Sequence, residues 1–204
     1  MPFVAILGLA GVGKTTVARQ LAKTLGGRAF CEPDRREWPS FIEDGFVEHA
    51  FDVLEWFRCY QVNAIRSAAA FGEYGLAICD AYYHKTMIGY VHHPSSEWII
   101  PKSDPYFSAL EKILELDANR LPNADLIIFL SVKHDQWRKM VRSRAQQGDD
   151  ILLASAFASQ EPMLHATEKH AFEVGIPMIH IQQQYGQLDD AVVQCSEFIK
   201  ENIA

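Results

Sequence analysis

The sequence predicts an α/β protein with a parallel β-sheet covered by helices on both faces. Two observations support this fold class. Short apolar runs alternate with longer helical patterns along the 204 residues, which is typical of βα units and a buried parallel sheet. The first apolar run, at 3–7, leads into a glycine-rich loop and then a helical pattern, the order in which a phosphate-binding loop is built.

The expected strands are apolar runs bounded by turn-forming or acidic residues. They lie at 3–7, 28–32, 76–79, 124–130 and 177–181. Pro33 closes the second run, and Asp80 follows the third. Runs of this length and composition indicate strands that are buried on both faces of a sheet.

The expected helices lie between these runs and after the last of them. They span 14–25, 47–71, 106–118, 134–147, 151–174 and 188–199. The first has an apolar stripe from Val17 to Leu25 and ends at the pair Gly26-Gly27. We expect the fifth helix to be kinked or split near Pro162. Between Tyr82 and Pro105 the periodicity fades, and clusters of proline and serine predict a long loop.

The composition is that of a globular protein. Hydrophobic residues make up 49% and charged residues 22% of the chain, and we expect a single domain over 1–204. No apolar run approaches the ~20 residues that span a bilayer, and Met1-Pro2 leads straight into the first strand, so we expect neither a membrane anchor nor a targeting segment. The four cysteines are widely spaced, which favours free thiols and a cytoplasmic location. The net charge of −7 argues against a nucleic-acid polymer as partner.

The stretch Gly8–Thr15 fits the phosphate-binding (Walker A) pattern of a glycine, four free positions and Gly-Lys-Thr. Its glycines let backbone N–H groups approach phosphate oxygens, Lys14 reaches the β- and γ-phosphates, and the Thr15 hydroxyl ligates Mg²⁺. The helix that begins at the loop adds its dipole. We therefore expect ATP and Mg²⁺ to bind here. The expected ATP-binding residues are Gly8, Leu9, Ala10, Gly11, Val12, Gly13, Lys14, Thr15 and Thr16.

Acidic residues follow two of the expected strands. Glu32 and Asp80 both lie at carboxyl ends of strands, where an open parallel sheet binds its ligands. Phosphoryl transfer needs a metal-bound triphosphate, a group that positions or deprotonates the acceptor, and cations for the migrating charge. We assign Glu32 as the base and Asp80 to the metal. The alternative for each is a carboxylate that caps the next helix.

A basic helix supplies the third requirement. Arg138 and Arg142 are four residues apart and share one helical face, and Arg144 is close around the turn. We expect Arg142 and Arg144 to act as arginine fingers in cis, closing over the γ-phosphate. The alternative is a solvated basic helix face.

Taken together, these motifs resemble the deoxynucleoside kinases, within the thymidylate-kinase-like group of P-loop kinases. The resemblance rests on Gly8–Thr15, on Glu32-Pro33 followed by Trp38, on 57–66, on Arg142-Ser143-Arg144-Ala145 and on 160–164. It implies a P-loop NTPase fold with a five-stranded parallel sheet, an arginine-bearing lid at about 133–150, and ATP-Mg²⁺ as phosphoryl donor. It also implies transfer to the 5′-hydroxyl of a deoxynucleoside, with Glu32 as base, and a possible homodimer formed through the 47–71 helix.

The resemblance further implies the substrate-binding residues. Gln61 and Arg66 are candidates near the base and sugar, and one of Trp56, Phe57 and Tyr60 is expected to stack on the nucleobase. An aromatic stripe on a long helix is also typical of a protein core, and this alternative stays open.

Two departures from the family pattern bear on the acceptor. The family has an arginine directly after the acid that ends the third strand, whereas Ala81 follows Asp80 here, with Lys85 or Arg66 as candidate substitutes. The loop after Glu32 is one residue longer and carries Arg35-Arg36, which could receive the phosphate of a nucleoside monophosphate or be solvated loop charge.

We therefore predict an ATP-dependent phosphotransferase that acts on a nucleoside. The first alternative is a nucleoside monophosphate kinase. The second is a non-catalytic, regulatory ATP-binding protein that kept the P-loop and lost the acceptor chemistry, as Ala81 permits.

Overall fold

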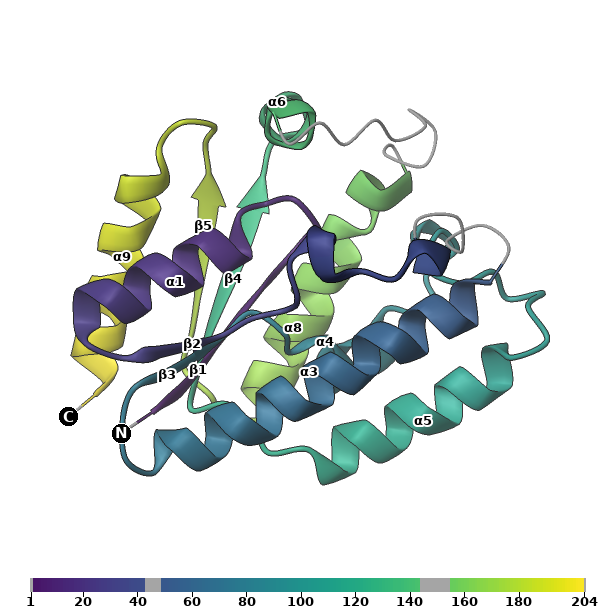
Figure 1. Ribbon diagram of the computed structural model, residues 1–204, viewed down its shortest axis with the longest axis horizontal. Helices are drawn as coiled ribbons and strands as arrows, with labels where there is room; N and C mark the ends of the chain where they lie inside the picture. The colour runs from purple at the N-terminus through teal and green to yellow at the C-terminus, as the bar shows by residue number, and fades with distance from the viewer. Residues whose placement is uncertain (1, 43–48, 144–154, 204) are drawn as a thin grey trace.

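A five-stranded parallel sheet forms the centre of the protein (Figure 1), as the resemblance implied. The computed structural model describes residues 2–42, 49–143 and 155–203. The strands are β1 (Phe3–Gly8), β2 (Arg28–Phe30), β3 (Ala77–Cys79), β4 (Leu126–Val132) and β5 (Met178–Gln183). Their order in the sheet is β2-β3-β1-β4-β5, and every neighbouring pair is parallel. All carboxyl ends therefore meet at one edge.

The two strands with the longest apolar runs lie at the centre of the sheet. Every residue of β1 and of β4 is buried, and the two strands pair from Val4 with Leu126 to Gly8 with Leu130. Asp125, expected inside β4, instead precedes it, and its carboxylate accepts a hydrogen bond from the Phe3 backbone N–H at 2.7 Å. The strand therefore begins and ends two residues later than predicted.

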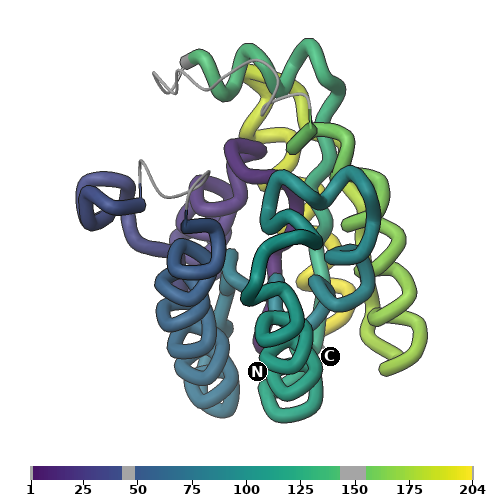
Figure 2. Tube along the Cα trace, turned by 90° about the vertical axis from the view of Figure 1, so that its right-hand side faces the viewer, coloured from purple at the N-terminus to yellow at the C-terminus, as the bar shows by residue number. Residues whose placement is uncertain are grey.

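Helices cover both faces of the sheet, as expected. On one face lie α1 (Lys14–Leu25) and α9 (Leu188–Asn202), which contact each other. On the other lie α3 (Ala50–Gly72) and α8 (Gln160–Val174). Outside these, α5 (Phe107–Arg120) runs beside α3 in Figure 2, and the Arg58 side chain on α3 binds Asp117 on α5 with Nε–Oδ2 and Nη2–Oδ1 distances of 2.6 and 2.8 Å.

The helix expected over 151–174 is divided, as predicted, but not at the proline. A helical turn at 155–158 ends at Ser159, and α8 begins at Gln160. Pro162 therefore lies in the first turn of α8, where a backbone N–H has no partner within the helix and proline is tolerated. Residues 151–154 lie outside the described part.

The segment expected as a long loop is partly helical, and this part of the prediction was wrong. It forms α4 (Tyr83–Thr86), η2 (Met87–Gly89) and η3 (Pro94–Ser96), and it buries Met87, Tyr90, Val91 and Ile100. Helices of one turn are too short to show a helical period in the sequence. The segment is part of the core and forms a wall beside the ends of the strands.

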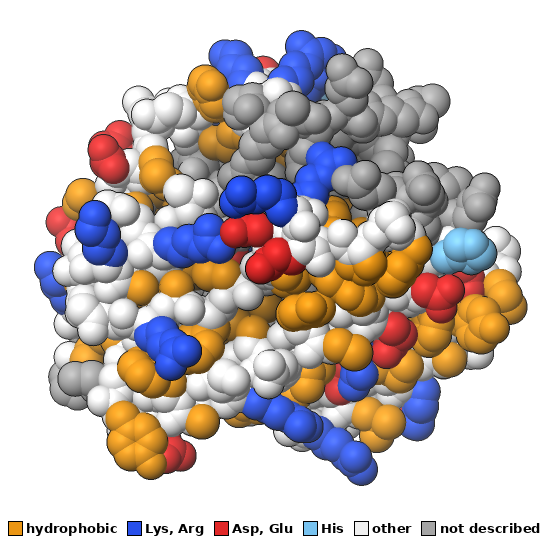
Figure 3. Space-filling view, viewed as in Figure 1, with side chains coloured by type: hydrophobic (Ala, Val, Ile, Leu, Met, Phe, Trp, Pro, Cys, Tyr) orange, Lys and Arg blue, Asp and Glu red, His pale blue; other side chains and the backbone are white. Residues whose placement is uncertain are grey.

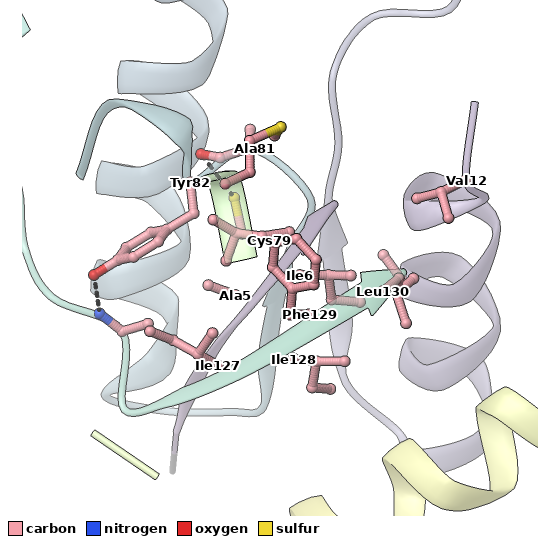
Figure 4. Packing of buried hydrophobic residues seen from close by; sticks show 14 of the residues in the cluster. Ala5, Ile6, Val12, Cys79, Ala81, Tyr82, Ile127, Ile128, Phe129 and Leu130 are labelled. Carbon is pink, nitrogen blue, oxygen red and sulfur yellow. Dashed lines mark hydrogen bonds between the residues drawn. The ribbon is translucent and has the colours of Figure 1, made fainter. Parts of the chain in front are cut away.

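The core extends from the sheet into the residues that follow β3. Figure 4 shows Ala81 and Tyr82 beside the buried side chains of β1 and β4, and both residues are fully buried. The Tyr82 hydroxyl accepts a hydrogen bond from the Ala124 backbone N–H at 3.1 Å.

Among the described residues, no helix is both long and apolar enough to cross a membrane.

Candidate functional site

A cavity of about 550 Å³ opens at the carboxyl ends of β1, β2 and β3. One end, here called the P-loop end, is lined by residues of the loop Gly8–Thr15 and by Glu32, which follows β2. Asp80, which follows β3, lies buried behind this end and binds both Thr15 and the Glu32 backbone. The other end, here called the apolar end, is lined mainly by hydrophobic side chains and contains His84 of α4. Its hydrophobic residues include Val53, Leu54, Phe57, Met87, Tyr90 and Trp98.

Positive φ angles shape the P-loop. A Cβ atom on Gly8, whose φ is +138°, would lie 2.2 Å from the carbonyl oxygen of Leu130 on β4. Gly13, directly before α1, has a φ of +97°, in the left-handed region that favours glycine. The loop therefore turns tightly enough to bring the first amides of α1 to the cavity, where they and the helix dipole favour an anion.

Lys14 lies in the loop with its ammonium group turned toward the backbone. Its Nζ donates to the carbonyl oxygens of Gly8 and Leu9 at 3.1 and 2.9 Å, and it lies 5.1 Å from the centre of the Tyr83 ring. The Tyr83 hydroxyl donates to the Gly8 oxygen at 3.3 Å. Burial and the nearby carboxylates of Glu32 and Asp80 raise the Tyr83 pKa well above its ordinary value, so this phenol stays protonated and remains a donor.

Thr15 and Asp80 meet across the mouth of the loop. The Thr15 hydroxyl donates to Asp80 Oδ2 at 2.5 Å, and Asp80 Oδ1 accepts from the Glu32 backbone N–H at 2.9 Å. A hydroxyl and a carboxylate side by side are hard oxygen donors that suit Mg²⁺. In the described ranges no group of three or more His, Cys, Asp or Glu side chains is arranged to hold a metal ion, so a cation here would complete its shell from water and phosphate oxygens.

Glu32 and Gln61 are in direct contact. Gln61 Nε2, from α3, donates to Glu32 Oε1 at 2.5 Å. Burial raises the pKa of the Glu32 carboxyl, and the Asp80 charge adds to this, while Lys14 and the Gln61 hydrogen bond act in the opposite direction. The net effect is a raised pKa, which makes this carboxylate a better proton acceptor than a solvated one.

The aromatic candidates on α3 fall on two faces of the helix. Phe57 and Gln61, one turn apart, line the cavity. Trp56 and Tyr60 do not, and their ring centres are 4.7 Å apart on the adjacent face, where Tyr60 borders a second hollow of about 350 Å³. Arg66 is exposed farther along α3 and does not line the cavity. Of the candidates on this helix, the structure therefore places Phe57 and Gln61 in the cavity that Glu32 lines, and only Gln61 binds Glu32.

The basic helix α6 (His134–Ser143) rests on the P-loop. Trp137 Nε1 donates to the Ala10 carbonyl oxygen at 2.9 Å. Arg142 is exposed on this helix and is not among the residues that line the cavity. Arg144 and the rest of the expected lid to residue 150 lie outside the described residues.

The mouth of the cavity carries charges of both signs. Arg19, Asp34 and Arg35 line it, and Arg19 Nη2 lies 3.3 Å from Asp34 Oδ1. Figure 3 shows basic and acidic side chains in contact near the centre of this face. Arg36, the other half of the expected arginine pair, is exposed and outside the lining.

Position 81 has no room for the arginine of the family pattern. Ala81 is fully buried in the apolar cluster of Figure 4. Lys85, a candidate substitute, points elsewhere, because its ammonium group donates to the carbonyl oxygens of Ala118 and Leu121 at the end of α5. Arg66 is too far along α3 to line the cavity. Neither candidate takes the place of the arginine in this structure.

Three residues near the cavity were not identified from the sequence. Tyr83 and His84 follow Asp80 within the segment expected as a loop, and Trp137 lies on the basic helix. A signal for the first two exists, because residues just after a strand of a parallel sheet lie at its ligand-binding edge. Trp137 gives no such signal, since its contact with Ala10 joins residues 127 positions apart.

The fold matches solved nucleoside and nucleotide kinase structures. A deoxyadenosine kinase from M. mycoides with bound dATP superposes with a TM-score of 0.65 at 14% identity, covering 100% of this chain and 99% of that one. A thymidylate kinase from Candida albicans superposes with a TM-score of 0.62 at 21% identity, covering 98% and 92%. The sequence itself matches no protein-family model and no curated relative. The chain therefore has the deoxynucleoside- and thymidylate-kinase-like fold over its whole length.

Proposed function

We propose that this protein is an ATP-dependent phosphotransferase that phosphorylates the 5′-hydroxyl of a nucleoside or deoxynucleoside. One observation carries the proposal: a single cavity is lined by the P-loop with Thr15, whose hydroxyl binds Asp80 behind it, by a carboxyl group with a raised pKa and by an apolar end. The fold supports it, because both kinases described above act on nucleosides or nucleotides by name.

The donor would bind at the P-loop end. The backbone amides from Gly8 to Thr16 and the Lys14 ammonium group bind the triphosphate, and Lys14 exchanges its carbonyl partners for phosphate oxygens. Thr15 and Asp80 would hold Mg²⁺, which neutralises charge on the β- and γ-phosphates. Tyr83, whose ring covers Lys14, keeps the ammonium group at the loop.

Glu32 would act as the base. The acceptor oxygen forms a bond to the γ-phosphorus, the bond from that phosphorus to the bridging oxygen breaks, and ADP leaves. The hydroxyl proton passes to Glu32. Its raised pKa suits this task, and the hydrogen bond from Gln61 fixes the direction of the carboxylate. Arg142 and Arg144 would close over the transferring group from the lid, which we take to span about 133–150.

The acceptor would bind with its base in the apolar end. Phe57 is the stacking candidate that lines the cavity, and Gln61 joins the base pocket to Glu32. Trp56, Tyr60 and Arg66 remain candidates only if α3 or its neighbours move on binding, because none lines the cavity in this structure.

A nucleoside monophosphate kinase is the second candidate. The observation that favours it is that Arg35 and Arg19 both line the cavity, where an acceptor phosphate could bind. Asp34 pairs with Arg19 and offsets part of that charge, which favours the uncharged acceptor. A regulatory ATP-binding protein is the third candidate, on the basis of Ala81.

The test is ADP release from ATP-Mg²⁺ with a panel of nucleosides and the matching monophosphates. We expect stimulation by at least one nucleoside. Stimulation by monophosphates alone would replace the proposal with the second candidate, and the variant Arg35→Ala should then raise the acceptor KM. ATP binding without ADP release for any acceptor would favour the regulatory protein.

A further inference from the structure

His84 is a buried polar side chain in the wall of the cavity with no partner of its own. The residue is 3% exposed, and neither Nδ1 nor Nε2 has a hydrogen-bond partner within the described ranges. A buried polar group without a partner destabilises the folded protein, because its hydrogen bonds to water are lost and not replaced. Such groups are rare in folded proteins, and each one requires an explanation.

The charged side chains that act on His84 are already paired with each other. Asp117 and Arg58 both act on the imidazole electrostatically, but they form a two-bond ion pair with each other. Both carboxylate oxygens of Asp117 accept from the Arg58 guanidinium group. The ion pair therefore fixes α3 against α5 and leaves His84 without a hydrogen bond.

His84 is a polar group on an otherwise apolar wall. The cavity around it is lined by the side chains of α3, η2 and Trp98 that define the apolar end. Gln61, the polar group on the α3 side, has its amide nitrogen bound to Glu32. A planar ligand in this end would thus meet hydrophobic side chains and the imidazole ring, whose two nitrogens are buried in the unliganded protein.

The imidazole is neutral. Burial lowers its pKa to about 4, the Arg58 charge acts in the same direction, and the Asp117 charge opposes it. A neutral imidazole carries one N–H donor and one acceptor nitrogen, so it complements either an amino or a carbonyl group. A half-turn about the Cβ–Cγ bond exchanges its nitrogens with ring carbons, so a rotation of the ring on ligand binding brings a buried nitrogen to the ring edge that lines the cavity.

We propose that His84 hydrogen-bonds the polar edge of the acceptor's heteroaromatic base and sets the base preference of the enzyme. The inference rests on the proposed function and narrows it to acceptors with an uncharged planar base that bears an amino or carbonyl group on the edge away from the sugar. His84 is a specificity-determining residue in this proposal and takes no part in the transfer step.

The first arm of the test compares His84→Phe with a matched control. Phenylalanine keeps a planar ring and removes both nitrogens. Ser196→Ala is the control, because the Ser196 hydroxyl is also buried without a partner among the described residues but belongs to α9, on the opposite face of the sheet. The acceptor is the best substrate among deoxyadenosine, deoxyguanosine, deoxycytidine and thymidine.

For His84→Phe we expect the acceptor KM to rise roughly 10- to 100-fold, as for loss of a buried hydrogen bond. The KM for ATP should stay unchanged. The melting temperature should stay unchanged or rise. Ser196→Ala should leave both KM values unchanged. An acceptor KM within twofold of the wild type overturns the proposal.

The second arm tests the wild-type protein, which covers the case in which His84→Phe does not fold, and it adds the variant where that protein folds. The wild-type protein is given deoxyribosides whose base lacks the exocyclic group, such as purine 2′-deoxyriboside in place of deoxyadenosine. We expect a similar loss for the truncated base with the wild type and little further loss with His84→Phe, because the two changes remove one hydrogen bond. Equal KM values for the intact and truncated bases in the wild type overturn the proposal.

Calorimetric titration with each nucleoside in the presence of β,γ-methylene-ATP separates this inference from the proposed function. Binding that depends on the base edge, without ADP release in the assay, contradicts the proposed function and supports the role of His84. No binding of any nucleoside overturns both.

Discussion

The two ends of the cavity are built in different ways. At the P-loop end each functional side chain already has a protein partner: Lys14 with two backbone carbonyls, Thr15 with Asp80, and Glu32 with Gln61. At the apolar end the imidazole of His84 has none within the described ranges. The first end is organised by the fold itself, whereas the second is left to be completed by a ligand. Changes at the P-loop end should therefore affect chemistry and folding, and changes at the apolar end should affect binding.

The largest effect is expected from two substitutions at the P-loop end. Lys14→Ala and Glu32→Gln should each lower kcat by about 10³-fold or more, because one removes a cation from the transferring phosphate and the other removes the base. Only Lys14→Ala should weaken ATP binding by more than tenfold, since Glu32 faces the acceptor. Steady-state kinetics and nucleotide titrations measure both quantities. Equal ATP affinity in the two variants would contradict the separate roles.

A comparison of two glycines tests whether the backbone builds the P-loop end. Gly8→Ala should destabilise the protein by about 3 kcal/mol or more, because the new Cβ would lie 2.2 Å from the Leu130 carbonyl oxygen. Gly175→Ala, at a φ of +76° with no atom within 4 Å, should cost only about 1 kcal/mol. Urea unfolding of both variants gives the difference. Equal losses would mean that φ alone, and not the contact with β4, decides the effect.

The difference between the two ends of the cavity also explains which part of the site could be predicted from the sequence. Apolar runs such as 3–7 are long enough to indicate buried strands, and parallel strands carry their carboxyl ends to one edge. These two rules suffice to place Glu32 and Asp80 beside the P-loop, where Glu32 lines the cavity and Asp80 binds Thr15. Motif and topology together therefore predict the P-loop end.

The apolar end does not follow from local patterns. Its walls include α4 and η2, which are too short to show a helical period, and His84 has no sequence motif. On α3 the aromatic residues span two faces, so the pattern does not separate Phe57 from Trp56 and Tyr60. The diversion of Lys85 to the end of α5 also depends on a long-range contact. The arrangement of the apolar end depends on side-chain packing between distant segments, which short sequence patterns do not predict.

A pH titration of stability probes the burial of His84 without any substrate. Because the folded protein lowers the His84 pKa from 6.5 to about 4, the unfolded chain binds a proton in this range that the folded chain does not. Wild-type stability should therefore fall, by about 1–3 kcal/mol relative to His84→Phe, as the pH drops from 6.5 toward 4. Asp117 opposes this shift and Arg58 enhances it, so the ion pair must stay intact. Parallel stability curves for the two proteins across that range would contradict the result.

The smallest effect is expected where the two ends meet, at Gln61. Its hydrogen bond to Glu32 lowers the Glu32 pKa, which burial raises. Gln61→Leu removes that bond, so the acid limb of kcat/KM should move to higher pH, by about one unit or less. Asn63→Ala is the control, because Asn63 lies on the same helix but borders the second hollow. A shift in both variants would point to a general change in α3. A shift in neither would mean that the acid limb of kcat/KM does not report the ionisation of Glu32. A shift confined to Gln61→Leu, with the acceptor KM raised as well, would show that one side chain of α3 connects the base pocket to the proton acceptor.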